Sequence, residues 1–296
     1  MSKMTEIKLK SYTLKIYNYG PRDIFHIPDP KIEYNCSNDI RSKGFDYIHK
    51  IVMLTERRPE ALSVLKDYLE LYSEKINCQN KKGWTPLHLA CRNSRTESTE
   101  ETVELLLSYF NINVNLEDDE GCTALHMACK YSNEDSTERT VALLLGHPDI
   151  NINSQTIYGE TSLSYACLNS NTNSSERTVE LLLGHPDINV NLPTECDEAP
   201  LHMACLFSGR NSTERTVELL VGHPTIDINF QVDGETALHL VCWNSNTDSI
   251  ERTFKTLLAH PKINVNLQNN VGQTVLHLAC TKNKIKIVEM LLCKTI

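Results

Sequence analysis

The heptapeptide TPLHLAC, from Thr85 to Cys91, decides the fold because it returns five times along the chain. The later copies are TALHMAC from Thr123, TSLSYAC from Thr161, APLHMAC from Ala199, TALHLVC from Thr236 and TVLHLAC from Thr274. Successive copies are 38, 38, 38, 37 and 38 residues apart. A repeat of this length predicts a solenoid, in which each unit buries its apolar side only by stacking on its neighbours.

Two helices are predicted in each unit. Leu87, Ala90 and Cys91 fall at positions i, i+3 and i+4, which places them on one face of a first helix. A second helix follows a polar stretch and carries a buried stripe that includes Val141 and Leu144. Prolines end this second helix, because proline cannot continue a helix, and they are Pro148, Pro186, Pro224 and Pro261.

A capping signal predicts where the second helix begins. An Asp or Asn stands three residues before a Glu, which is the spacing of a capping box. The pairs are Asp135 and Glu138, Asn173 and Glu176, Asn211 and Glu214, and Asp248 and Glu251. We therefore expect the Asp or Asn to cap the second helix.

The unit resembles the ankyrin repeat, and the resemblance covers residues 44 to 296. It is carried by the Thr-Pro-Leu-His motif, a later Leu-Leu-Leu run and a Val-Asn pair before the next turn. A Gly two positions before the motif also matches, at Gly83, Gly121, Gly159, Gly234 and Gly272, with Asp197 in its place once. The resemblance implies an all-α ankyrin-repeat α-solenoid, whose helix-turn-helix units are joined by β-hairpin-like fingers.

The chain is divided into an N-terminal extension, residues 1–41, and a repeat array, residues 42–296. Gly44 and His49 preserve part of the motif, so residues 44–81 are expected to form a degenerate capping repeat. The remaining repeats are expected to start near residues 82, 120, 158, 196, 233 and 271. Residues 7–19 alternate in the manner of one or two short strands, which we expect to pack on the first repeat.

The repeats are longer than the usual ankyrin unit of about 33 residues. Four additional residues lie between the two helices, in inserts rich in Ser, Asn, Thr and Glu, and the last unit lacks this insert. Such a composition does not bury apolar area, so the inserts are expected to be surface turns that leave stacking untouched. Long units of this kind resemble those of ankyrin proteins from giant amoeba viruses, intracellular bacteria and protists.

Composition predicts a cytoplasmic protein in a reducing compartment, including the cytoplasm of a host cell. No apolar run approaches the 18 residues of a membrane span. The first residues, MSKMTEIKLK, lack the apolar region of a secretory signal. Cysteines at one position of successive units would stand about 10 Å apart, beyond disulfide reach, so we expect buried thiols at Cys91, Cys129, Cys167, Cys205, Cys242 and Cys280.

A His three residues before these cysteines is the strongest metal candidate, but zinc needs four ligands around one point. The pairs instead repeat along a line, and Ser164 replaces the His once. The resemblance implies that the His is a structural hydrogen-bonding residue. No cofactor and no metal is therefore expected. The histidines are His88, His126, His202, His239 and His277.

Two further residues, a His and an Arg, recur at equivalent positions of successive repeats, and both have structural interpretations. Histidines before the helix-ending prolines are interpreted as caps on the C-terminal carbonyls of the second helix, rather than as pH sensors; they are His147, His185, His223 and His260. Arginines beside the Glu column predict a solvated charge ladder, and they are Arg139, Arg177, Arg215 and Arg252. No phosphate loop, nucleophile motif or separate carboxylate pair was found, so an enzyme is not expected.

The charge favours a protein partner. The net charge is −9, while residues 1–41 hold seven Lys and Arg against five Asp and Glu, so the array is acidic. An acidic array repels phosphates, which excludes nucleic acid and favours a partner with a basic segment.

The partner is expected to contact positions that vary from unit to unit. The resemblance implies that finger tips and first helices line a concave binding surface. Aromatic residues and Arg dominate such interfaces, although the aromatic residues could instead pack between helices. The predicted binding residues are Lys81, Lys82, Trp84, Arg92, Glu120, Tyr131, Ile157, Tyr158, Glu160, Leu168, Glu195, Leu206, Phe207 and Trp243.

A monomeric protein-protein interaction module without catalysis is the predicted function. One alternative is a self-associating scaffold, which would use an apolar end near Ile285 to Leu292 and Cys293. Another is a host-targeting adaptor or effector of a virus or intracellular microbe. An enzyme with a site in residues 1–41 is disfavoured, because so short a segment does not form an independent domain.

Overall fold

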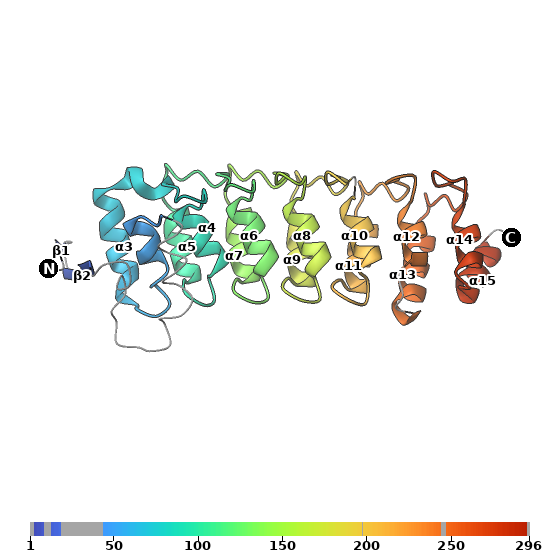
Figure 1. Cartoon of the computed structure of the whole chain (residues 1–296), viewed down its shortest axis with the longest axis horizontal. Helices are drawn as coiled ribbons and strands as arrows, with labels where there is room; N and C mark the ends of the chain where they lie inside the picture. Colours follow the sequence, from blue (N-terminus) through green and yellow to red (C-terminus); the bar gives the residue numbers. More distant parts are fainter. Residues whose placement is uncertain (1–2, 9–12, 19–43, 197, 244–246, 295–296) are drawn as a thin grey trace. The chain divides into compact units, whose positions relative to one another are not determined.

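The computed structural model describes residues 3–8, 13–18, 44–196, 198–243 and 247–294. Contacts divide the chain into two compact units, Met1–Ala124 and Leu125–Ile296. In both units the repeats consist of paired helices, with a finger at one end of each pair and a loop at the other (Figure 1).

The first unit holds a two-stranded antiparallel sheet and the first repeats. The strands pair from Lys3 opposite Asn18 to Lys8 opposite Thr13. Its elements are β1 (Lys3–Lys8), β2 (Thr13–Asn18), α2 (Tyr47–Val52), α3 (Glu60–Leu71), the 3-10 helix η1 (Ser73–Asn77), α4 (Pro86–Arg92) and α5 (Glu100–Leu107).

The second unit contains the remaining helix pairs, in which the even-numbered helix is the inner one and the odd-numbered helix the outer one. They are α6 (Ala124–Tyr131), α7 (Glu138–Leu145), α8 (Ser162–Asn169), α9 (Glu176–Leu183), α10 (Pro200–Leu206), α11 (Glu214–Val221), α12 (Ala237–Trp243), α13 (Thr247–Ala259), α14 (Val275–Thr281) and α15 (Ile285–Lys294). Inner helices pack on inner helices, as α10 does on α8, and outer helices pack on outer helices, as α11 does on α9. The predicted stripe is buried at Val141 and Leu144.

The histidine of the motif is structural, as the resemblance implied. His88 Nδ1 accepts a hydrogen bond from the backbone N–H of Thr85 at 3.1 Å, and Nε2 donates to the carbonyl of Cys122 in the next finger at 2.9 Å. His239 makes the same bridge to the carbonyl of Gln273. His49 does so toward Trp84, at 2.9 Å. In these repeats the ring therefore ties one repeat to the next.

The cysteine prediction is correct at five of its positions and wrong at the last. Cys129 and its equivalents up to Cys242 are buried, and burial raises the pKa of the Cys242 thiol to about 12. Cys280, in the last repeat, is exposed because no described residues pack on that side of α14.

The predicted caps of the outer helices are wrong. The capping residue is the hydroxyl residue directly before the Glu: Ser175 Oγ accepts from the backbone N–H of Thr178 at 3.2 Å. Asn173 lies two residues earlier in the insert, where it cannot reach the first turn. Thr99, Thr137 and Thr213 cap the equivalent helices. In the fifth copy the helix starts earlier, so Asp248 lies inside α13.

The inserts are not free surface turns, which also corrects the prediction from their composition. The backbone N–H of Asn133 donates to the carbonyl of Asn173 at 2.9 Å, and that of Asn171 donates to Asn211 at 2.9 Å. Inserts of successive repeats therefore join in register. Their hydrogen bonding is satisfied by the neighbouring insert, which composition alone did not reveal.

Several inserts also bury hydroxyl groups. Ser132 Oγ lies 2.7 Å from Thr178 Oγ1 and 3.2 Å from Ser174 Oγ, and both partners are fully buried. Ser170, Ser212 and Thr216 repeat this arrangement one unit later. We call these buried side chains the hydroxyl ladder. It stabilises the stack because every buried hydroxyl meets another from the adjacent repeat.

The fingers stack through close backbone contacts. Gly159 has a φ of 72°, and a Cβ there would come within 2.7 Å of the backbone nitrogen of Glu195. That nitrogen donates to the carbonyl of Tyr158 at 2.9 Å. Only Gly allows both the left-handed conformation and this approach. Asp197, the one predicted replacement for the Gly, lies outside the described residues.

Candidate protein-binding surface

In each of the two units, the exposed side chains of the fingers and inner helices form what we call its inner surface. Every predicted binding residue lies on these elements, and none is buried. The exposed ones are Lys81, Lys82, Glu120, Ile157, Tyr158, Glu195 and Trp243. The half-buried ones are Trp84, Arg92, Tyr131, Glu160, Leu168, Leu206 and Phe207.

In the first unit, Trp84 combines two kinds of polar contact. Its indole Nε1–H donates to Asp118 Oδ2 at 2.9 Å. The guanidinium of Arg92 lies over the indole ring, 5.4 Å from the ring centroid. An aromatic ring is thus held between a carboxylate of the next finger and a cation of its own inner helix.

The same combination occurs in the second unit around Tyr165. The Tyr165 hydroxyl donates to Glu160 Oε2 at 2.5 Å, and Lys130 Nζ lies 4.9 Å from the centre of the ring. The predicted residues included Glu160 but missed Tyr165. A signal existed, because the other copies of the heptapeptide have Leu or Met at this position.

A third combination surrounds Trp243, which is 48% exposed. The indole Nε1–H donates to Glu235 Oε1 at 3.3 Å, and Lys282 Nζ lies 3.9 Å from the ring centroid. Glu235 was not among the predicted residues. Glu235 directly precedes the repeated motif, as Glu160 does, so its register could have revealed it.

Several large apolar side chains remain in contact with solvent. Tyr158 is 56% exposed and Ile157 52% exposed at one finger tip. These values argue against the alternative that the predicted aromatic residues pack between helices, at least at Tyr158 and Trp243. Phe110, in the turn after α5, is 96% exposed and was not predicted.

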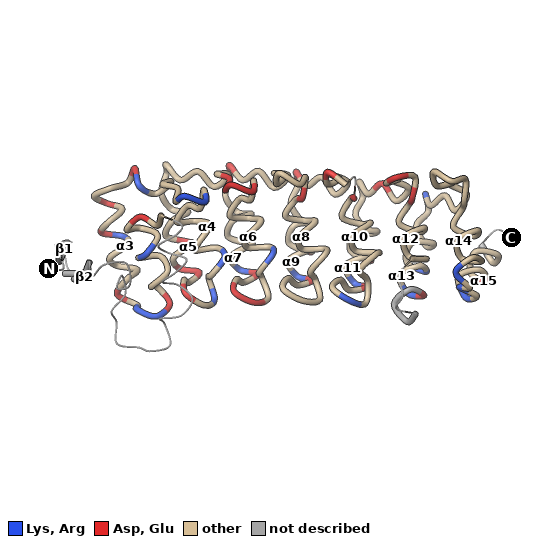
Figure 2. Tube along the Cα trace, in the orientation of Figure 1, with Lys and Arg blue, Asp and Glu red and all other residues tan. Residues whose placement is uncertain are grey.

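The fingers are mostly acidic. Figure 2 shows Asp and Glu gathered along the fingers of both units. In the first unit they belong to residues 117–120, next to the basic pair Lys81 and Lys82. In the second unit they are Glu160, Glu195, Glu198, Asp233 and Glu235. An acidic surface of this kind attracts cationic groups and repels phosphates.

Family comparison agrees with this geometry. A family model described as "Ankyrin repeats (3 copies)" matches residues 53–139, 135–231 and 201–296. The chain belongs to the ankyrin-repeat family. Human "Ankyrin repeat domain-containing protein 7" is 39% identical over 62 residues, which are 20% of this chain and 24% of that protein. The chain thus spans about a quarter of that relative's length.

Solved ankyrin structures share the fold. The ankyrin repeat domain of Bcl-3, described as a member of the IkappaB family, has 22% identity and a TM-score of 0.68, covering 84% of this chain and 99% of that one. An ankyrin repeat domain from Acinetobacter baumannii has 21% identity and a TM-score of 0.58, covering 70% and 96%.

A third similar structure comes from a complex. The structure is described as the predatory endopeptidase Bd0816 of Bdellovibrio bacteriovorus in complex with the immunity protein Bd3460. The matching chain has 22% identity and a TM-score of 0.53, covering 70% of this chain and 97% of that one. Identities this low establish the ankyrin fold and nothing further. Ankyrin repeats are protein-protein interaction modules, and the family is generally non-catalytic.

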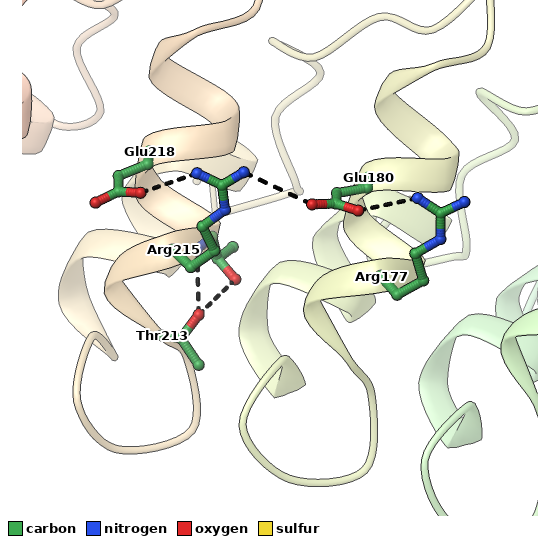
Figure 3. Close-up of polar contacts among 6 residues, drawn as sticks. Arg177, Glu180, Thr213, Arg215 and Glu218 are labelled. Atoms are coloured by element: carbon green, nitrogen blue, oxygen red, sulfur yellow. Dashed lines mark hydrogen bonds and ion pairs between the residues drawn. The ribbon is translucent and has the colours of Figure 1, made fainter.

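The outer helices carry the predicted charge ladder (Figure 3). Arg215 pairs with Glu218 at 3.1 Å and with Glu180 of the preceding repeat at 3.7 Å, while Arg177 pairs with Glu180 at 3.0 Å. The carboxylates are three residues after each Arg, rather than the adjacent Glu that we expected. Exposed pairs of this kind stabilise a protein by about 1 kcal/mol or less.

The second histidine column does not cap helix carbonyls as predicted. His147 Nδ1 instead accepts from the backbone N–H of Asp149 at 3.2 Å. His185, His223 and His260 make the same contact. The ring lies beyond the helix end, so the nearest unsatisfied group is the amide that follows the proline.

Two negative observations concern the described residues alone. They contain no group of three or more His, Cys, Asp or Glu side chains that could hold a metal ion. Their helices include none that combines the length and the apolar character needed to cross a bilayer.

Proposed function

We propose that the chain binds a partner protein through its inner surface and performs no catalysis itself. The observation that carries this proposal is the exposure of Tyr158 and Trp243 beside carboxylates, on a surface that stacking does not use. Exposed aromatic residues in a polar setting are typical of interface hot spots. The family and the complex containing an immunity protein support a protein partner.

A basic segment is the part of the partner that fits best. The second unit places Glu160, Glu195, Glu198, Asp233 and Glu235 on its fingers and inner-helix starts. We place this interaction in a reducing cytoplasm, because Cys129, Cys167 and Cys242 are buried thiols. We also propose that the chain divides into an N-terminal extension, residues 1–41, and a repeat array, residues 42–296.

Capture from the native cell tests this function. The Tyr158→Ala, Phe207→Ala, Trp243→Ala triple variant should lose a protein that the wild-type chain retains. The matched control is Arg177→Ala with Arg215→Ala, which alters the exposed charge ladder on the outer helices. A partner that survives the triple variant but is lost with the control would place binding on the outer face and refute the proposal.

End-to-end self-association is a second candidate, favoured by the outer side of the last repeat. Val271 is 76% exposed and Ile285 70% exposed, and Cys280 and Leu292 of the same repeat are exposed as well. Side chains at the Cys280 position of earlier repeats are buried by the next repeat. Light scattering over a range of concentrations tests this: a constant monomer mass excludes it, whereas a mass that rises with concentration and falls with Ile285→Lys supports it.

A further inference from the structure

Three carboxylates form a row along the inner surface of the second unit. Glu160, Glu198 and Glu235 each stand two residues before the inner helix of consecutive repeats. The corresponding inner helices α8, α10 and α12 pack side by side (Figure 1). Packed helices are about 8 to 10 Å apart, so neighbouring carboxylates of the row are separated by a similar distance.

The two outer carboxylates each use one oxygen to hold an aromatic ring. Glu160 Oε2 accepts from the Tyr165 hydroxyl, and Glu235 Oε1 accepts from the Trp243 indole. Among the described residues, nothing donates to the second oxygen of either carboxylate. Both sites place an oriented ring next to an available carboxylate oxygen, and the ring is exposed at Trp243 and buried at Tyr165.

Both rings already attract a cation from their own chain. Lys282 Nζ lies 3.9 Å from the Trp243 centroid and Lys130 Nζ lies 4.9 Å from that of Tyr165. Within the described chain, neither lysine forms an ion pair with the carboxylate that holds its ring. A guanidinium can stack on a ring and donate to a neighbouring carboxylate simultaneously, which a compact ammonium group does less well.

The middle carboxylate has no cation at all among the described residues. Glu198 is half-buried, and burial raises the pKa of its carboxyl group because the charged form loses water. An incoming cation would restore the stability of the charged form. The row therefore has three positions at which a partner's cation would be favourable.

We propose that this row binds an extended segment of the partner that carries arginine at every third residue, and that Lys130 and Lys282 occupy the ring faces until the segment displaces them. A polyproline II chain has three residues per turn and rises about 3.1 Å per residue. Every third side chain then points the same way at about 9 Å intervals, which matches the row. The inference rests on the proposed function and specifies its ligand.

Synthetic peptides test the spacing with the full chain. The probe is (Arg-Ala-Pro) repeated three times, labelled for fluorescence anisotropy, and two controls are a peptide of the same composition with its arginines consecutive and a citrulline version. We expect the spaced peptide to bind at least about 10-fold more tightly than the clustered one, because only its arginines match the spacing of the row and each hydrogen bond to a charged group is strong. We expect the citrulline peptide not to bind. Equal affinity of the spaced and clustered peptides would overturn the proposal.

Variants test the displaced lysine. Glu235→Gln should weaken the spaced peptide about 10-fold, and Trp243→Ala about 3-fold. Lys282→Gln should strengthen binding about 3-fold, because it removes the competing cation. Lys262→Gln removes an equal charge from an exposed turn after α13 and should change affinity less than about 2-fold. Thermal midpoints of Glu235→Gln and Lys282→Gln establish that both variants fold.

The outcomes separate this inference from the proposed function. Equal effects of Lys282→Gln and Lys262→Gln would show that only net charge matters, which overturns the displacement. If no peptide binds while the inner-surface triple variant still loses a captured partner, the arginine row is wrong and the proposed function stands. If the inner-surface variants keep both peptide binding and partner binding, the arginine row and the proposed function are both refuted.

Discussion

The interior repeats and the last repeat share one motif but differ in what it does. Cys129, in an interior repeat, is fully buried, whereas Cys280 at the same position of the last repeat is exposed. His239 is buried and His277 is exposed. The sequences TALHMAC and TVLHLAC do not explain this difference. Burial of the motif is therefore supplied by the following repeat and not by the motif itself.

The hydrogen bonds of the motif histidine also differ between the interior repeats and the last repeat. His277 keeps its bond within the repeat, since Nδ1 lies 2.8 Å from Thr274 Oγ1, as His239 Nδ1 does from Thr236 Oγ1. The bond between repeats is different: His239 Nε2 donates to Gln273, but His277 Nε2 has no such acceptor among the described residues. Local bonds form in every copy, while inter-repeat bonds need a neighbour.

Burying a charge should produce the largest contrast between these regions. Cys129→Asp places an unpaired carboxylate in a fully buried position, and we expect it to lower the free energy of unfolding by about 4 kcal/mol or more. Cys280→Asp introduces the same side chain at the exposed equivalent and should cost less than about 0.5 kcal/mol. Urea unfolding of both variants measures this. Similar losses would mean that burial does not distinguish the two repeats.

Exchanging loops would test why the last repeat manages without an insert. Replacing the insert residues Asn171–Ser174 by the short turn of the last repeat removes five inter-repeat hydrogen bonds, including those to Asn211 and Ser132. At about 1 kcal/mol each, the expected loss in unfolding free energy is about 5 kcal/mol.

Thr172→Ala is the control for this exchange, because its exposed hydroxyl bonds only within its own insert. We expect it to change the unfolding free energy by less than about 0.5 kcal/mol. A loop exchange as mild as this control would show that the hydroxyl ladder contributes nothing to stacking.

Acid should weaken the interior through its buried histidines. Burial lowers the pKa of His202 to about 4, below the ordinary value of 6.5. The unfolded chain therefore takes up the proton first as pH falls. Stability from this group is complete above pH 6.5 and is lost progressively as the pH falls toward 4, by roughly 3 kcal/mol. Urea midpoints at several pH values between 7 and 4.5 measure the slope.

A natural replacement supplies the control. The third copy has Thr161 and Ser164, whose side chains lie 2.8 Å apart, where the fourth has Ala199 and His202. Ala199→Thr with His202→Ser should therefore fold and show a smaller loss of stability on acidification. An unchanged pH slope would exclude His202 as a contributor.

The fold was predictable because its signals are local and repeated. The heptapeptide, the Gly before it and the Leu run revealed helix pairs and fingers, and the structure confirms them at Gly159 and Val141. The inserts were mispredicted because Ser174 looks like a solvent-facing residue until the next repeat supplies its partner. The caps failed for another reason: Asn173 and Ser175 both suit a helix start, and only geometry selects Ser175.

The candidate surface was predictable only in outline. Variation between units led to Trp243 and Tyr158, which are exposed. The contact of Lys282 with Trp243 could not be predicted because it depends on how two successive repeats pack. Such contacts between distant residues leave no periodic signal in one sequence.

The central claim is that repeated residues hold the stack while variable residues bind the partner. Affinity for the captured partner and thermal midpoint, measured together for Tyr158→Ala, Phe207→Ala and Trp243→Ala, test it most directly, with the buried repeated residue Leu182→Ala as reference. The account predicts that the three aromatic variants each lose roughly 1 to 4 kcal/mol of binding free energy with nearly unchanged thermal midpoints. Only Leu182→Ala should have a clearly lower thermal midpoint. Collapse of the midpoint in all three aromatic variants, with affinity preserved, would contradict it.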